Sequence, residues 1–131
     1  MSAVSSWLLH RCDGKAIRQR RRRNFLFLQE RVAEGATLLF ENLPEGVCPL
    51  FFPLLVPDKR IAAEALWRRG IGVVEFGNEG DPEANREAFP DVQFLRDHVL
   101  ELPIHQDLTP TQLGYMAEQV LTLKSRFEAD R

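Results

Sequence analysis

Few side chains in this chain of 131 residues have the types and spacing that catalysis or metal binding requires. Its two cysteines and three histidines show no zinc-ligand spacing, and no serine stands in a nucleophile-elbow pattern. No glycine-rich phosphate loop is present either. Cys48, which precedes Pro49 at the start of an expected strand, is interpreted as a buried and inert thiol. We therefore predict no catalytic, cofactor-binding or metal-binding residue within the chain.

The most visible cluster of charge is the run of Arg20, Arg21, Arg22 and Arg23. Such a run could neutralise the phosphates of a nucleic acid. Successive residues on a helix point about 100° apart, however, so four arginines surround a helix and form no single contact stripe. The chain beyond its first 31 residues is acidic, and the net charge is −2. A solvated or partner-facing helix is therefore favoured over a nucleic-acid site.

His105 is the histidine with the most suggestive position. It follows a Leu-Pro-Ile segment at the end of an expected strand and stands shortly before a helix. Binding sites often gather at such strand ends. The alternative is a histidine whose ring is satisfied by the loop backbone. The second interpretation is favoured, although His105 stays a candidate.

The first element that must position these groups is a long helix, expected over residues 15–34. Asp13 can cap its start, Gly35 can end it, and its apolar residues fall near one stripe. The Phe-Leu-Phe-Leu run at 25–28 widens that stripe beyond what one small core needs. We therefore expect this broad apolar face to stay exposed and to drive self-association. Residues 36–47 follow as a connection rich in turn residues.

The middle of the chain predicts a strand, a helix and a second strand. Residues 50–56 form an apolar run of strand length, in which Pro53 indicates an edge strand or a bulge because it cannot donate to a ladder. The next helix is expected to be capped by Asp58 and ended by Gly70. Its expected inner face consists of Ile61, Ala62, Ala65 and Leu66. Residues 72–76 are expected to form the second strand and residues 77–82 a dense turn.

The last third predicts a short helix over residues 92–97 capped by Asp91, a strand over residues 99–102 and a final helix. That helix has Thr109 as N-cap, Pro110 at its first position and Gln112 at its third. Its expected inner face consists of Leu113, Met116, Ala117, Val120 and Leu121. The predicted fold class is α+β, with a small, mostly antiparallel sheet of three to four strands. Helices are expected to cover mainly one face of it, with a long N-terminal helix among them.

Length and composition fit one globular domain. The chain is 44% hydrophobic and 27% charged, which is ordinary for a soluble protein, and its length suffices for one core. The Trp-Leu-Leu run near the start is too short for a signal-peptide core or a membrane span. We expect a cytoplasmic protein without a membrane partner, divided into an N-terminal segment (1–14) and a domain (15–131).

Five segments of the sequence form a pattern when they are taken in order. They are Arg-Arg-Arg-Asn-Phe at 21–25, Leu-Phe-Phe-Pro-Leu-Leu-Val-Pro-Asp at 50–58, Arg-Gly-Ile-Gly at 69–72, Leu-Pro-Ile-His at 102–105 and Leu-Thr-Pro-Thr-Gln-Leu at 108–113. Together they resemble the small C-terminal domain of the DegT/DnrJ/StrS sugar aminotransferases. The resemblance covers about residues 15–124, in the order and spacing of that family.

The resemblance implies a fold-type-I enzyme, usually a dimer, that transfers an amino group from glutamate or glutamine to a keto sugar. Its cofactor is pyridoxal phosphate, held as a lysine Schiff base in a large domain. Lys15, Lys59 and Lys124 lie in none of the family's lysine contexts. The resemblance therefore implies a domain that lacks the catalytic lysine and is inactive alone. Its implied partner is the large catalytic domain or a second copy of this chain.

In such enzymes the small domain closes over the substrate. By position, the strand after Arg-Gly-Ile-Gly would face the active site, which makes Glu75, Phe76 and Asn78 candidate substrate contacts. His105, at its own strand end, is the fourth substrate-facing candidate. Many family members carry a histidine near the strand that holds Glu75, and this sequence has none there.

Two other functions stay open on the sequence alone. The complete caps and turns suit an independent ligand-binding or regulatory module of the same fold, whose ligand would raise its melting temperature. The arginine run would suit a nucleic-acid-binding protein, whose affinity would fall steeply with salt.

Overall fold

The structure is a computed structural model that describes residues 2–78 and 88–129. Within them the elements are α1 (Ala3–Arg11), α2 (Gly14–Val32), β1 (Thr37–Leu38), β2 (Phe51–Leu55), α3 (Lys59–Trp67), β3 (Val74–Glu75), α4 (Pro90–His98), β4 (Val99–Pro103) and α5 (Pro110–Ala129). The four strands form an antiparallel sheet in the order β1-β2-β4-β3. The predicted α+β class with a long helix near the N-terminus is confirmed. The elements α1 and β1 were not expected from the sequence.

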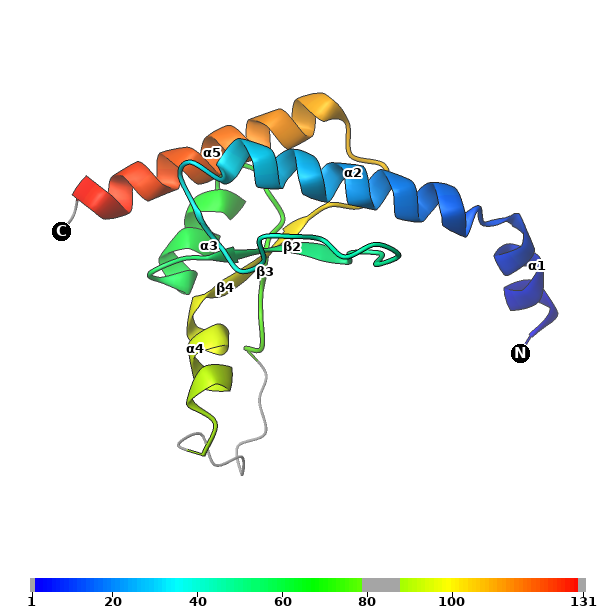
Figure 1. The fold of residues 1–131 in the computed structure, drawn as a ribbon, viewed down its shortest axis with the longest axis horizontal. Coiled ribbons are helices and arrows are strands. Elements are labelled where there is room, and N and C mark those ends of the chain that lie inside the picture. The colour runs from blue at the N-terminus through cyan, green and yellow to red at the C-terminus, as the bar shows by residue number, and fades with distance from the viewer. Residues whose placement is uncertain (1, 79–87, 130–131) are drawn as a thin grey trace.

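The core lies between one face of the sheet and three helices. Figure 1 shows α2 and α5 side by side over the sheet, and α3 completes this layer. Alternating residues of β2 and β4 point into it, and Phe52, Leu54, Leu100 and Leu102 are 2% exposed or less. The helices contribute Phe25, Leu28, Val32, Ala62, Ala63, Leu66, Leu113, Met116, Ala117, Val120 and Leu123. Burial of each large side chain stabilises the fold by about 1.5–3 kcal/mol, so this layer holds the domain together.

Pro53 belongs to β2, which lies between β1 and β4. Among the described residues, however, no strand pairs with Pro53 on the side away from β4, so the proline occupies a local edge, as the sequence suggested. The register between β2 and β4 is continuous, with Pro53 opposite Glu101. The Val56 amide donates to the His98 carbonyl oxygen, and hydrogen-bonded pairs recur at every second residue of an antiparallel ladder. The Pro53 nitrogen therefore points away from β4. On that side β1 pairs only with the last two residues of β2, so no donor is required of the proline.

Four predicted helix ends are confirmed. The carboxylates of Asp13 and Asp58 each accept a bond, at 2.9 Å, from the amide three residues on. Thr109 and Gln112 exchange the two bonds of a capping box at the start of α5. Gly70, after α3, has a φ of +77°, as a left-handed helix ending requires. These ends fix where each helix begins or stops, and they depend only on neighbours within a few residues.

Two predicted inner faces are wrong at single positions. Ile61 of α3 is 58% exposed, and Ala63 is buried in its place. In α5 Leu121 is only partly buried, whereas Leu123 belongs to the core. In each helix the apolar residues fit two adjacent helical stripes almost equally well. Packing against the sheet decides which stripe is buried.

Three further expectations need correction or lie outside the described chain. Asp91 does not cap α4, because Pro90 already occupies the first helical turn and Phe89 is the N-cap residue. Cys48 is exposed and not buried, since it belongs to the loop before β2. Of the turn expected over residues 77–82, Gly77 has a φ of +65°, and residues 79–82 lie outside the described part.

The arginine run anchors α2 to two loops. Arg22 Nη1 donates to the carbonyl oxygens of Pro44 at 2.6 Å and Val47 at 2.8 Å. Arg21 Nε donates to Gln106 Oε1 at 3.1 Å. The other two arginines of the run are exposed. The four side chains therefore leave the helix in different directions, as the helical geometry predicted.

The broad apolar face of α2 is largely used inside the domain. Phe25 and Leu28 belong to the core, and Phe27 is partly buried with the Arg31 guanidinium 5.2 Å from its ring centroid. Leu26 alone of this run stays substantially exposed, at 46%. The expected exposed face is therefore much smaller than the sequence suggested, and self-association through it stays a prediction.

Candidate functional site

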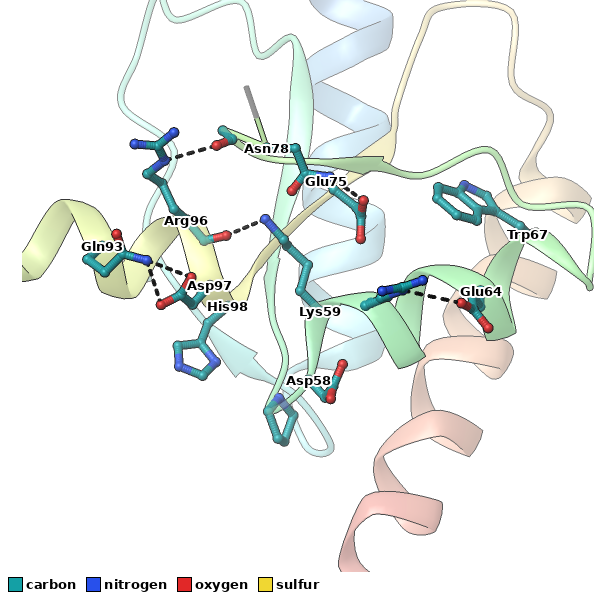
Figure 2. Close-up of a pocket in the computed structure, with 13 residues that line it drawn as sticks. Asp58, Lys59, Glu64, Trp67, Glu75, Asn78, Gln93, Arg96, Asp97 and His98 are labelled. Carbon is teal, nitrogen blue, oxygen red and sulfur yellow. Dashed lines mark hydrogen bonds and ion pairs between the residues drawn. The ribbon is translucent and has the colours of Figure 1, made fainter. Parts of the chain in front are cut away.

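An open cleft of about 870 Å³ lies between α3, the end of β3 and α4 (Figure 2). Most of its lining is polar: Asp58, Lys59, Arg60, Glu64, Trp67, Glu75, Asn78, Gln93, Arg96, Asp97 and His98. Because α4 runs directly into β4, which pairs with β3, the pairing brings α4 next to the end of β3. The cleft therefore gathers side chains from three segments that are far apart in the sequence.

Lys59 and Arg96 fix the backbone at the end of β3. The Lys59 ammonium donates to the carbonyl oxygen of Phe76 at 2.9 Å. It also donates to the carbonyl oxygen of Arg96 (Figure 2). Arg96 Nε donates in turn to the Gly77 carbonyl oxygen at 2.9 Å. A Cβ on Gly77 would lie 2.9 Å from Arg96 Cγ, so this close approach requires glycine. These charge-assisted bonds join the first turn of α3, the end of β3 and α4 into one unit.

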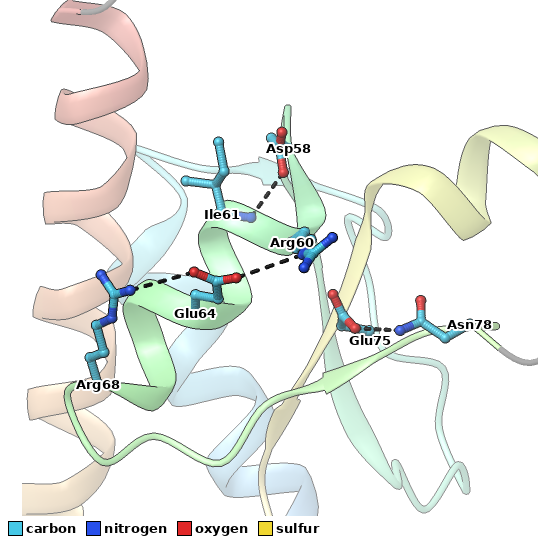
Figure 3. A network of polar contacts seen from close by, with 7 residues as sticks. All are labelled: Asp58, Arg60, Ile61, Glu64, Arg68, Glu75 and Asn78. Atoms are coloured by element: carbon cyan, nitrogen blue, oxygen red, sulfur yellow. Dashed lines mark hydrogen bonds and ion pairs between the residues drawn. The ribbon is translucent and has the colours of Figure 1, made fainter.

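One wall of the cleft presents a carboxylate and an amide together. Glu75 accepts a hydrogen bond from Asn78 Nδ2 across the turn after β3 (Figure 3). On α3, Glu64 pairs with Arg60 and with Arg68, at 3.6 Å in each case. Those three side chains are largely exposed, so their ion pairs add little stability. The Glu75–Asn78 bond instead orients two groups that a ligand could meet.

A histidine also reaches the cleft. His98 Nδ1 lies 2.9 Å from the Val56 carbonyl oxygen, and because a carbonyl can only accept, this ring nitrogen carries a hydrogen. Nε2 is then the acceptor of the neutral ring. Phe94 packs against the imidazole with ring centroids 4.6 Å apart. The cleft thus contains an oriented imidazole that comes from the junction of α4 and β4.

Three of the four candidates named from the sequence come together here. Glu75 and Asn78 line the cleft, and Phe76 supplies the carbonyl oxygen that Lys59 holds. His105 is exposed and does not line this cleft. It lines a separate hollow beside Pro103.

Sequence reasoning missed Lys59, Arg96 and His98 as members of this cleft. Nothing in the spacing of residues 59, 96 and 98 shows that they meet, because strand pairing and the course of α4 bring them together. One signal was present for Lys59. A lysine in the first turn opposes the helix dipole, which indicates that its ammonium has a partner outside the helix.

The cleft can bind a polar ligand through donors and acceptors at once. Lys59 and Arg96 offer cationic donors, while Glu75 and Asp97 offer anionic acceptors. None of the lining residues in the described part of the chain has a hydroxyl or thiol side chain. This mixture suits a hydroxyl-rich ligand such as a sugar better than an apolar one.

Main-chain carbonyls hold the one lysine side chain among the described residues that line the cleft. A Schiff-base lysine must present a free amine, whereas the Lys59 ammonium is engaged by two main-chain carbonyls. Over residues 2–78 and 88–129, no three His, Cys, Asp or Glu side chains are placed to hold a metal ion. In the same residues, no helix combines the length and apolar character needed to cross a membrane.

Solved structures with the same fold are known, although the sequence itself matches no known family. No protein-family model and no curated protein matches the sequence. A DegT/DnrJ/EryC1/StrS aminotransferase from Brucella abortus matches with a TM-score of 0.68 and 14% identity, over 82% of this chain and 31% of that chain. CalS13, a sugar aminotransferase from Micromonospora echinospora, matches with a TM-score of 0.70 and 21% identity, over 87% and 32%. A sugar aminotransferase from Streptococcus pneumoniae in its pyridoxal-phosphate form gives 0.74 and 13%, over 86% and 32%.

The fold is therefore that of one part of the sugar aminotransferases of the DegT/DnrJ/EryC1/StrS class. The chain spans about a third of the length of these structures. The resemblance inferred from the five sequence segments is confirmed at the level of the fold.

Proposed function

We propose that this chain is the small domain of a pyridoxal-phosphate-dependent sugar aminotransferase. The observation that carries the proposal is the fold match, which covers more than four-fifths of this chain but only about a third of each aminotransferase. The cofactor and its Schiff-base lysine would belong to a large domain, on the same polypeptide or on another. That domain is the proposed partner, and this chain alone would not catalyse transamination.

Within such an enzyme, the cleft would contribute one wall of the substrate site. Glu75 and Asn78 would accept from and donate to sugar hydroxyls, and Lys59 and Arg96 would hold the backbone that carries them. Two free, exposed cysteines suit a reducing compartment, which supports a cytoplasmic location.

The direct test is to capture the native protein from its source with an antibody against this chain. We expect a complex or polypeptide more than twice the length of this chain, with one pyridoxal phosphate that borohydride fixes to a lysine outside residues 1–131. A native species of 15.1 kDa without any pyridoxal-phosphate partner would overturn the proposal.

A second test uses the isolated chain. After incubation with pyridoxal phosphate and reduction with borohydride, we expect only scattered, substoichiometric labelling of surface lysines such as Lys15. One stoichiometric adduct on Lys59, abolished in Lys59→Arg, would mean that this chain binds the cofactor itself. That result would contradict the assignment of the cofactor to another domain.

The alternative is a stand-alone ligand-binding module, and one observation favours it. Side chains from three separate segments of this chain already meet in the polar cleft. A sugar or sugar phosphate that raises the melting temperature of the isolated chain, but not of Glu75→Gln, would support the module. Nucleic-acid binding is the third candidate. It would require affinity that falls with salt, although Arg21 and Arg22 already bind loops of the chain.

A further inference from the structure

Trp67, the last residue of α3, keeps an aromatic surface open to solvent at one end of the cleft. Its Nε1 donates to the carbonyl oxygen of Val73 at 2.9 Å, which fixes the polar edge of the indole. The residue is nevertheless 47% exposed, and among the described residues the core forms without it. Because the polar edge is engaged, the exposed part is mainly ring carbon. The indole is therefore a fixed apolar plane that the core does not use.

The indole lies near the paired carboxylate and amide at the end of β3. Trp67, Glu75 and Asn78 all line the cleft, and the same three side chains line a second hollow of about 490 Å³. In Figure 2 the Trp67 ring and the Glu75 carboxylate lie on the same side of β3. The bond from Asn78 uses only one acceptor position of the carboxylate, so oxygen atoms of both side chains can still accept from a ligand. One wall thus combines an apolar plane with two oriented polar groups.

This combination matches the two kinds of surface on a sugar ring. A pyranose presents C–H groups on its faces and hydroxyls around its edge, so it can stack on an aromatic plane while its hydroxyls donate to nearby oxygen atoms. The described residues that line the second hollow include one acid, Glu75, and no base. A phosphate in that hollow would face the carboxylate, and like charges repel. The wall therefore favours an uncharged ring.

We propose that Trp67 is the stacking platform for an uncharged pyranose ring whose hydroxyls are bound by Glu75 and Asn78. The inference deepens the proposed function and rests on it, because this ring would belong to the sugar substrate. A ring with equatorial hydroxyls lies flat on the indole, whereas an axial hydroxyl on the stacked face holds the ring away from it. Trp67 is therefore a residue that determines specificity and takes no part in bond making.

Nuclear magnetic resonance of the full isotope-labelled chain can follow this indole directly. The Nε1–H groups of Trp7 and Trp67 give separate signals, and Trp7→Phe assigns them. Methyl β-glucopyranoside should shift the Trp67 signal with a Kd of about 1–10 mM, the range expected for a ligand of this size. The Trp7 signal should stay in place, which makes this indole, 54% exposed, an internal control.

Two variants separate stacking from a structural role of the indole, with binding measured from the side-chain amide signal of Asn78. Trp67→Ala should weaken the glucoside at least about fivefold, the lower end of what the loss of one aromatic stacking partner costs. Trp67→Phe loses the bond to Val73 but keeps an aromatic ring, so its affinity should stay within about threefold of the wild type. The matched control is Trp7→Ala, which removes the other exposed indole and should leave binding unchanged.

Several results would overturn the platform. One is a Trp67 signal that does not move at about 100 mM glucoside, and another is unchanged binding in Trp67→Ala. Equal binding of methyl β-altropyranoside, whose chair has axial hydroxyls on both faces, would contradict flat stacking. A nucleoside that moves the Trp67 signal at lower concentration than the glucoside would assign the indole to a base. None of these results bears on a captured pyridoxal-phosphate partner, so failure of the platform and failure of the proposed function are distinguishable.

Discussion

Replacing Asn24 should destabilise this domain more than any change at a neighbouring surface position. Asn24 is the polar residue among the buried positions of α2, and its side chain is only 2% exposed. Its Nδ2 donates to the carbonyl oxygens of Ile104, at 3.3 Å, and His105, at 2.9 Å. It therefore ties the middle of α2 to the chain between β4 and α5, in the segment that carries the family resemblance.

The expected cost follows from what Asn24→Ala leaves behind. Each lost hydrogen bond costs about 1 kcal/mol net, and a buried carbonyl oxygen without a donor adds a desolvation penalty of similar size. The His105 carbonyl keeps a bond from the Leu108 amide at 3.2 Å, so the penalty falls mainly on Ile104. We expect a loss of about 2–3 kcal/mol in the free energy of unfolding. Asn24→Asp should cost more, because it aims a carboxylate at two carbonyl oxygens.

Urea unfolding followed by circular dichroism measures both variants against the wild type. The unfolding midpoint should fall while its slope stays constant. The carbonyl oxygens around the new carboxyl group raise its pKa in the folded state. At low pH the protonated carboxyl can donate a hydrogen bond, so the loss of unfolding free energy in Asn24→Asp should be smaller. That loss should grow as the pH rises through the folded-state pKa. Arg23→Ala, at the exposed neighbouring position, is the control and should change stability by less than about 0.5 kcal/mol. A loss below about 0.5 kcal/mol for Asn24→Ala would refute the reasoning.

Four other changes have defined expectations. Gly70→Ala should cost about 1–2 kcal/mol, because a Cβ opposes its φ of +77° although it meets no neighbouring atom; thermal unfolding measures this. Thr109→Ala should cost about 1 kcal/mol through loss of the capping box, also measured by thermal unfolding. Burial raises the pKa of Glu101 in the fold, so wild-type stability should fall as pH rises through that pKa. Glu101→Gln should remove this dependence of stability on pH, measured by urea unfolding at a series of pH values. Lys59→Met should free the end of β3, and hydrogen exchange should be faster at the Phe76 amide while core amides are unchanged.

The candidate site was predictable only in part. Glu75, Phe76 and Asn78 lie within four residues of one another, so the resemblance could name them as a group. Lys59 and Arg96 come from segments 37 residues apart in sequence, and hydrogen bonds through main-chain carbonyls bring them together. No local pattern reports such bonds, because a main-chain acceptor exists at every residue. The raised pKa of Glu101 likewise depends on neighbours in two other strands.

The sequence by itself determined four of the helix ends, the α+β class and the resemblance to a known fold. Asp13, Asp58, Gly70 and Thr109 act on amides or dihedral angles within a few residues, so their effects can be read along the chain. Only the tertiary structure decided which strands flank β2, which helical stripe faces the core and which residues meet in the cleft. Those outcomes depend on which distant strands pair and on how the helices pack against the sheet. The free energy gained by burial depends on contacts throughout the core, and most of those contacts join residues that are far apart in the sequence.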